Sequence, residues 1–202
     1  MSAPSVVVRS VFGREITQYI DDLAALRIEV FRAYPYLYDG DVGYERAYLA
    51  EYAAHAQSVV VVASDGATVI GAATAMPLLA HGESVSKPVA DAGFDPSQVY
   101  YFGESVLRSA YRGQRIGHAF FDHREAAARQ FGFAGAAFCA VDRGVSHPAR
   151  PVDYVPHDKF WTGRGFVRRP DIVAHMAWRD VGDTVETSKP LPFWFKTLGV
   201  AQ

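Results

Sequence analysis

The chain lacks the features that mark several large classes of protein. It contains a single cysteine, Cys139, among 202 residues, which excludes an intramolecular disulfide and a cysteine-based zinc cluster. No apolar segment approaches the ~20 residues that a helix needs to span a bilayer, and the first residues lack the basic and apolar regions of a signal peptide. Neither sign of charge dominates, because the formal net charge is −2, so no broad nucleic-acid surface is expected. We therefore expect a cytoplasmic protein without a membrane or nucleic-acid partner.

The composition that is present is that of a folded domain. The hydrophobic fraction is 50% and the charged fraction is 21%, values typical of globular proteins. The length suits one domain over residues 1–202, and no repeat or linker divides it. Several Asp and His residues follow position 141, but their irregular spacing indicates no metal site.

Hydrophobic spacing predicts the elements of the first half. Residues 6–12 form a β-branched run typical of a strand. A helix is expected from Ile16, to be ended by Pro35, and a second from about Tyr44 to His55. Two strands, 58–63 and 68–76, are joined through Asp65-Gly66, a strong hairpin signal. Residues 78–96 are expected to be a loop with at most one short helix, because glycines and prolines interrupt them.

The second half is predicted in the same way. Strands are expected at 99–107, 133–141 and 173–179, a helix from Arg115 to a stop at Gly132, and one or two helical turns at 158–161. Residues 142–156 contain three prolines and a glycine and are expected to be loop. The tail, 184–202, is rich in aromatic residues. It is expected to pack on the domain or to form a subunit contact, which makes a homodimer a candidate.

The segment Glu104–His118 carries the clearest functional signal. An apolar run with one carboxylate ends at the basic turn Arg112-Gly113-Gln114-Arg115-Ile116-Gly117, which leads into a segment with helical periodicity. Strand, anion-binding loop and helix are the predicted order, because free N–H groups at a helix start favour phosphate. The turn satisfies neither G-x-x-x-x-G-K-[ST] nor G-x-G-x-x-G, so two common nucleotide motifs are excluded.

The turn resembles the pyrophosphate loop of the GNAT N-acetyltransferase superfamily, whose pattern is [QR]-x-x-G-x-[GA]. Arg112 fills the first position and Gly117 the last, whereas Arg115 stands where the family usually has glycine. The order of predicted elements agrees. The resemblance implies an α/β (α+β) GNAT fold, with a mixed, mostly antiparallel central sheet of about six to seven strands, helices on both faces and a splayed central strand pair.

The resemblance also implies a co-substrate, acetyl-CoA, and no metal. Transferred by position, the pantetheine arm would contact Val106, Leu107 and Ser109. The diphosphate would contact the residues of the turn and the helix start, namely Arg112, Gly113, Gln114, Arg115, Ile116, Gly117 and His118.

Candidate groups for proton transfer follow from the same resemblance. Glu104 lies where relatives often place a basic carboxylate; alternatively it is structural and paired with Arg108 or Arg112. Relatives usually protonate the leaving thiolate from a tyrosine, but Trp161 occupies that position and its indole has no useful acidity. Tyr154 or His157 could replace it, or the thiolate could leave unassisted.

The candidate acceptor-binding residues lie in an aromatic and acidic segment that includes Tyr34, Tyr36, Tyr38 and Asp39. These residues either pack around a loop or form a cleft wall that attracts a cationic amine. We expect an acetyl-CoA-dependent N-acetyltransferase that transfers directly to the primary amine of a small cationic molecule. The alternatives are a peptide or protein N-acetyltransferase and a non-catalytic acyl-CoA-binding module.

Overall fold

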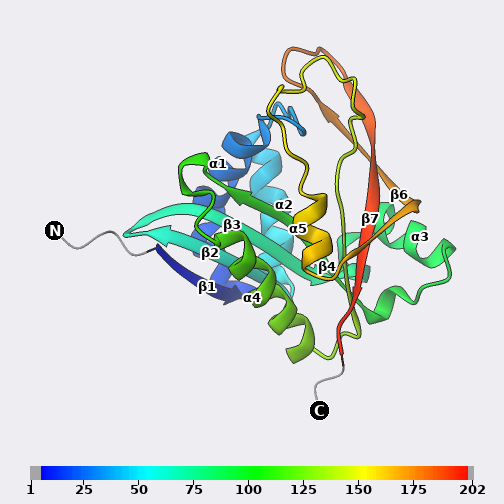
Figure 1. Ribbon diagram of the computed structural model, residues 1–202. Helices are drawn as coiled ribbons and strands as arrows, with labels where there is room; N and C mark the ends of the chain where they lie inside the picture. The colour runs from blue at the N-terminus through cyan, green and yellow to red at the C-terminus, as the bar shows by residue number, and fades with distance from the viewer. Residues whose placement is uncertain (1–5, 200–202) are drawn as a thin grey trace.

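The computed structural model describes residues 6–199, which form one sheet of seven strands covered by helices (Figure 1). The strand order is β1-β2-β3-β4-β5-β7-β6, and every neighbouring pair is antiparallel except β4 and β5. The strands are β1 Val6–Phe12, β2 Val59–Asp65, β3 Thr68–Pro77, β4 Val99–Leu107, β5 Gly135–Cys139, β6 Val167–Arg179 and β7 Glu186–Thr197.

The α-helices are α1 Ile20–Phe31, α2 Val42–Ala54, α3 Glu83–Asp91, α4 Ile116–Gln130 and α5 Asp158–Gly163. Short 3₁₀ helices occur at η1 Gly13–Tyr19, η2 Leu78–His81, η3 Pro96–Gln98 and η4 Ser109–Tyr111. Among residues 6–199, no helix combines the length and the apolar character needed to cross a membrane.

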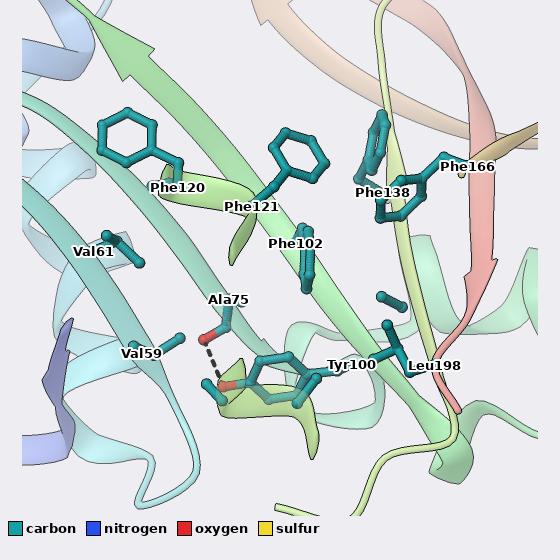
Figure 2. Packing of buried hydrophobic residues seen from close by; sticks show 14 of the residues in the cluster. Val59, Val61, Ala75, Tyr100, Phe102, Phe120, Phe121, Phe138, Phe166 and Leu198 are labelled. Carbon is teal, nitrogen blue, oxygen red and sulfur yellow. Dashed lines mark hydrogen bonds between the residues drawn. The ribbon is translucent and has the colours of Figure 1, made fainter. Parts of the chain in front are cut away.

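Alternate side chains of the strands build a core on each face of the sheet. Val60 and Val62 of β2 pack with α1 and α2, whereas Val59 and Val61 join the core under α4. On that second face, rings from α4, β4 and β5 meet edge to face: Phe121 lies 5.8 Å from Phe102 and 6.0 Å from Phe138 between ring centroids (Figure 2). The α4 helix is thereby fixed against the two strands that diverge below it.

β4 and β5 separate after a short parallel contact, as the expected splay requires. They pair only through Val99, Tyr100 and Tyr101 with Gly135, Ala136 and Ala137. Beyond Tyr101, the edge of β4 that faces β5 has no strand partner in the described part of the chain. Free main-chain groups therefore face the opening between the strands.

A bulge in β4 changes which side chains face α2. Ala75 pairs with Phe102 and Ala73 with Ser105, so Thr74 lies opposite two residues, Gly103 and Glu104. The sequence predicts this irregularity from a glycine inside a strand. Side chains of a regular strand alternate between the two faces of the sheet, and the extra residue in the bulge interrupts this alternation. As a result, Tyr101 before the bulge and Val106 after it contribute to cores on the same face. The bulge thus turns Glu104 toward α1 and α2.

Most predicted elements are confirmed, and two predicted strand boundaries need correction. Residues 78–96 contain one α-helix, the nine-residue α3, which covers β6; the expectation for this segment allowed one short helix. The strand predicted at 173–179 begins earlier, at Val167, and the strand predicted at 133–141 is shorter, Gly135–Cys139. The buried face of α4 includes two charged residues, Arg124 and Glu125. The adjacent His123 is partly exposed, and its Nδ1 lies 2.8 Å from Ser10 Oγ.

The aromatic tail belongs to the interior of the sheet. Glu186–Thr197 is β7, which pairs with β5 on one side and β6 on the other. Phe193 and Trp194 are buried there. Residues 200–202 of the predicted tail and residues 1–5 lie outside the described residues.

Candidate active site

The turn before α4 presents a row of unpaired main-chain donors. The N–H groups of five consecutive residues donate to no other group described in residues 6–199; they belong to Gly113, Gln114, Arg115, Ile116 and Gly117. They lie at the start of a 15-residue helix, whose dipole favours negative charge. No carboxylate within the described range pairs with Arg112 or Arg115. These free donors form a cradle of the kind that binds phosphate groups.

The unusual Arg115 has a conformation that favours glycine. Its φ is +63°, in the left-handed region, and it is the N-cap residue of α4. A residue with a Cβ adopts this conformation at a cost of about 1–2 kcal/mol. The backbone shape therefore matches the glycine of the resembled loop, and the arginine adds a cation to it. Gly113, with φ +78°, needs the same freedom.

The strand edge that leads to this loop fits an extended ligand. The side chains of Val106 and Leu107 pack into the cores on opposite faces of the sheet. Their main chain borders the opening between β4 and β5, and Ser109 is exposed at the start of η4. His118 packs its ring on Phe160 of α5, with centroids 4.9 Å apart. The expected pantetheine residues thus lie between the bulge and the cradle.

A cavity of about 840 Å³ opens on the α2 side of the bulge. Its walls come from α1, α2, β4 and β6, and Glu104 lies in it with its side chain 7% exposed. Six carboxylates line this cavity against two arginines: Asp39, Asp41, Glu45, Glu51, Glu104 and Glu186, with Arg27 and Arg179. The lining therefore attracts cations.

Arg27 binds two carboxylates inside this cavity. It pairs with Glu45 and with Glu104, and its guanidinium carbon lies 4.3 Å from the centre of the Tyr48 ring. Burial lowers the pKa of Arg27, but the charges of Glu104 and Glu45 outweigh that effect and raise it. Glu45 is completely buried, and its Oε1 accepts no hydrogen bond from the described residues. Two carboxylates and one guanidinium leave a net charge of about −1 at the cavity floor.

The tyrosine-rich segment divides between two cavities. Tyr36, Tyr38 and Asp39 line the cavity that holds Glu104. Tyr34 instead lines a smaller cavity of about 230 Å³ beside α5. The segment is held by the β6–β7 turn, where Asp39 N donates to Arg179 O at 2.9 Å and Val181 N donates to Leu37 O at 2.7 Å. These residues therefore form a wall of the larger cavity, in addition to packing around a loop.

The two candidates for protonating a thiolate lie near the end of β5. Tyr154 lines the smaller cavity and meets Tyr34 edge to face at 4.7 Å. His157 lies 5.7 Å from the Trp161 ring, and its pKa is lowered by burial and by Arg112. Trp161 itself packs on Phe138 and Trp194. Neither Tyr154 nor His157 lines the cavity that contains Glu104.

Tyr36 shares the larger cavity with Glu104 and with Cys139, which lies at the end of β5. Burial raises the pKa of Tyr36, and the charges of Cys139, Glu104 and Tyr154 raise it further. The Cys139 thiol is buried against the Tyr101 hydroxyl at 3.1 Å, and burial raises its pKa to about 12.

The sequence did not identify four residues that surround Glu104: Arg27, Glu45, Tyr48 and His81. The proposed structural partners of Glu104 are also wrong: Arg108 binds Glu29, with 3.0 Å between Nη2 and Oε2, and Arg112 makes no ion pair in the described chain. Charged residues inside otherwise apolar helical patterns were the available signal. Arg27 lies among the buried residues of α1, and Glu45 lies on the buried face of α2.

Comparison with known proteins agrees with this geometry. A family model described as the acetyltransferase (GNAT) family matches residues 23–152. The chain therefore belongs to the acetyltransferase (GNAT) family and is an acyltransferase. No curated protein sequence matches the chain.

Solved structures of low sequence identity share the fold. An N-acetyltransferase from Staphylococcus aureus Mu50 is 13% identical, with a TM-score of 0.59 over 96% of this chain and 99% of that one. A GCN5-related N-acetyltransferase from Kribbella flavida is 18% identical, with a TM-score of 0.59 over 96% and 98%. A Salmonella typhimurium structure, whose description includes its cofactor acetyl-CoA, is 13% identical, with a TM-score of 0.60 over 98% and 96%.

Proposed function

We propose that this enzyme transfers an acetyl group from acetyl-CoA directly to the primary amine of a small cationic molecule. The observation that carries the proposal is the cavity floor, where Glu104 and Glu45 share one arginine. An ammonium ion that enters the cavity beside this pair completes the charge balance of the two carboxylates and the one guanidinium.

The residues between β4 and α4 fit acetyl-CoA. The five free N–H groups, with Arg112 and Arg115 beside them, suit a diphosphate, and the unpaired edge of β4 suits an amide-containing arm. When bound, acetyl-CoA supplies the acetyl thioester. The bulge turns Glu104 into the larger cavity, which is lined by β4, the strand that would hold this arm.

Glu104 would act as the general base. An amine of pKa ~10.4 must lose a proton before it attacks, which costs roughly 4.6 kcal/mol at neutral pH. Glu104 is fixed by Arg27 and by the Tyr48 hydroxyl, which donates to Oε2 at 3.0 Å. A positioned carboxylate of this kind accepts the proton as the amine attacks. Tyr154 or His157 would return a proton to the thiolate, or it leaves unassisted because a thiol of pKa ~8.5 is a fair leaving group.

The test is an acceptor panel with acetyl-CoA, in which release of free CoA is measured. The panel contains mono- and diamines, a neutral aromatic amine, and a peptide with a free amino terminus. We expect turnover with cationic small amines and loss of at least about a hundredfold in kcat for Glu104→Gln, the scale of general base catalysis. Preference for the peptide, or full activity of Glu104→Gln, would contradict the acceptor or the base, respectively.

A further inference from the structure

We propose that Tyr48 and His81 form a relay that carries the acceptor's proton from Glu104 toward solvent. The inference rests on the proposed function, since it requires Glu104 to receive that proton. It concerns two side chains, from α2 and η2, that the sequence pattern did not bring together with Glu104.

The three residues form a continuous hydrogen-bonded path. The Tyr48 hydroxyl lies 3.0 Å from Glu104 Oε2 and 3.4 Å from His81 Nε2. Tyr48 is therefore the bridge between the carboxylate and the imidazole. His81 is partly exposed, precedes the exposed Gly82, and lines the wall of the cavity, so the path ends at a solvent-accessible residue.

Glu104 needs an exit for its proton. The side chain of Glu104 is 7% exposed. Besides Tyr48, its carboxylate binds the guanidinium of Arg27, which cannot take up a proton because it has no acceptor atom. Among the described groups that bond the Glu104 carboxylate, only the Tyr48 hydroxyl can both accept and donate a proton. Without this route, the protonated carboxyl group would have to lose its proton through the occupied cavity before the next turnover.

The transfer is balanced and creates no tyrosinate. The O–H bond of the protonated Glu104 breaks as its proton goes to the Tyr48 oxygen. The Tyr48 O–H bond breaks in the same step, and that proton binds His81 Nε2. Tyr48 is again a neutral phenol, Glu104 is again a carboxylate, and the imidazolium then releases one proton to water.

The surroundings of His81 keep its imidazole neutral, so that it can accept a proton. Tyr48 and Tyr52 face it from α2, Tyr101 and Glu104 from β4, and Arg27 from α1. Burial lowers the pKa of His81, which the Glu104 carboxylate partly opposes. Burial also raises the pKa of Tyr48, so this group remains a hydroxyl. A neutral imidazole therefore faces the Tyr48 hydroxyl at neutral pH.

Tyr52 provides a matched control for the relay. Its hydroxyl bonds the Tyr48 hydroxyl at 2.9 Å, and it belongs to the same aromatic cluster. It does not lie between Glu104 and His81. Tyr52→Phe therefore removes a neighbouring hydroxyl without interrupting the path.

The experiment compares Tyr48→Phe, His81→Gln, His81→Ala and Tyr52→Phe with the wild-type enzyme, using the best amine of the panel. We expect kcat to fall about tenfold or more for the first three variants, within the general acid–base range. The affinity for acetyl-CoA should be unchanged, and Tyr52→Phe should retain most activity. Added imidazole should restore kcat to His81→Ala but not to Tyr48→Phe, an outcome that a purely structural role cannot produce.

The outcomes separate the relay from the function on which it rests. If Glu104→Gln is inactive while folded Tyr48→Phe and His81→Gln keep the wild-type kcat and pH profile, the relay is overturned and the proposed function stands. Loss of kcat in His81→Ala without rescue by imidazole also overturns it. If the wild-type enzyme acetylates no amine, both proposals fail together. Circular dichroism of each variant verifies that it is folded.

Discussion

Arg27 determines the charge of the candidate site at the level of single residues. A guanidinium between two buried carboxylates neutralises one of them and leaves the other to attract a cation. Its position over the Tyr48 ring also orients the hydroxyl that bonds Glu104. Under the proposed function, acceptor binding and the positioning of the base would depend on the same ion pairs.

Glu45→Gln tests the charge of the cavity floor. The change takes the floor from about −1 to neutral, so we expect KM for a cationic amine to rise about tenfold, equivalent to about 1.4 kcal/mol. The KM for an aromatic amine that is neutral at pH 7 should change little. Steady-state kinetics with both acceptors measures the difference.

Glu51→Gln is the matched control, because it removes the same charge from the same helix at an exposed position on the cavity wall. An equal effect of Glu45→Gln and Glu51→Gln on the cationic amine would show that the buried pair has no special role.

Single residues were the least predictable part of the chain. Glu104 was found because it lies a short distance before a loop motif with fixed spacing. Its partners come from α1, α2 and η2, segments distant in sequence whose meeting depends on tertiary packing. The Tyr36–Asp39 segment was identified by composition, but composition could not show that Tyr34 faces a different cavity.

At the level of elements, β4 and α4 act as one unit. The bulge sets the direction of Glu104, and Arg124 of α4 holds the bulge by donating to Thr74 O at 3.3 Å and Glu104 O at 3.2 Å. Burial lowers the pKa of Arg124 to about 9, opposed by the Glu104 charge. A buried arginine thus satisfies carbonyl groups that the irregular ladder leaves without strand partners.

Arg112→Ala and Arg115→Ala test the cradle at the start of α4. Both side chains are exposed beside the free N–H groups, so we expect each change to weaken acetyl-CoA binding about five- to tenfold, near 1 kcal/mol. The salt dependence of Kd should also decrease, because fewer cations meet the phosphates. Titration calorimetry at two ionic strengths measures both quantities.

Arg129→Ala removes the same side chain at the opposite end of α4. It should bind acetyl-CoA as the wild-type enzyme does. If all three variants bind equally well, the diphosphate lies elsewhere.

Elements were more predictable than residues because their signals are local. Alternation, an Asp-Gly turn and a glycine within a strand correctly predicted β1 to β4 and the bulge. The bounds of the α3 helix were not predicted, because Pro88 lies inside it and the segment around it contains glycines. β7 was described only as an apolar tail, because a strand inserted between β5 and β6 depends on long-range pairing.

For the whole molecule, the long β6–β7 hairpin forms one wall of the proposed acceptor cavity. The turn of this hairpin contacts the Tyr36–Asp39 segment, and Arg143, which lies in the loop after β5, forms hydrogen bonds with both. Arg143 donates to Pro35 O at 2.9 Å, Tyr36 O at 2.6 Å and Asp180 Oδ1 at 2.9 Å. Lys189 of β7 also binds Asp180, with 3.1 Å between Nζ and Oδ1. Asp180 therefore joins three segments that are distant in sequence.

Asp180→Asn tests this joint, since it leaves Arg143 and Lys189 without their shared carboxylate. The Asp180 side chain is 15% exposed, so we expect a loss of about 3 kcal/mol in the free energy of unfolding at neutral pH. KM for the acceptor should rise because the Tyr36–Asp39 wall loosens. The affinity for acetyl-CoA should be unchanged, because the cradle before α4 lies on another part of the sheet.

The pH dependence of that loss is fixed by the pKa of Asp180. Burial raises this pKa, but the bonds from Arg143 and Lys189 lower it below its ordinary value overall. A depressed carboxyl pKa contributes stability that is complete above the unfolded value of about 3.9 and is lost as pH falls through the folded value. The difference between wild type and Asp180→Asn should therefore shrink in acid, measured by urea unfolding at neutral pH and near pH 3.

Asp171→Asn is the matched control for this series, because Asp171 is an exposed carboxylate of β6, the strand that Asp180 directly follows, and it pairs with Arg169 at 2.6 Å. It should leave stability and acceptor KM nearly unchanged, as exposed ion pairs contribute little. A stability loss for Asp180→Asn that is equally large in acid would mean that its charge is not the cause. Unchanged acceptor KM in a clearly destabilised Asp180→Asn would separate the hairpin joint from the acceptor wall.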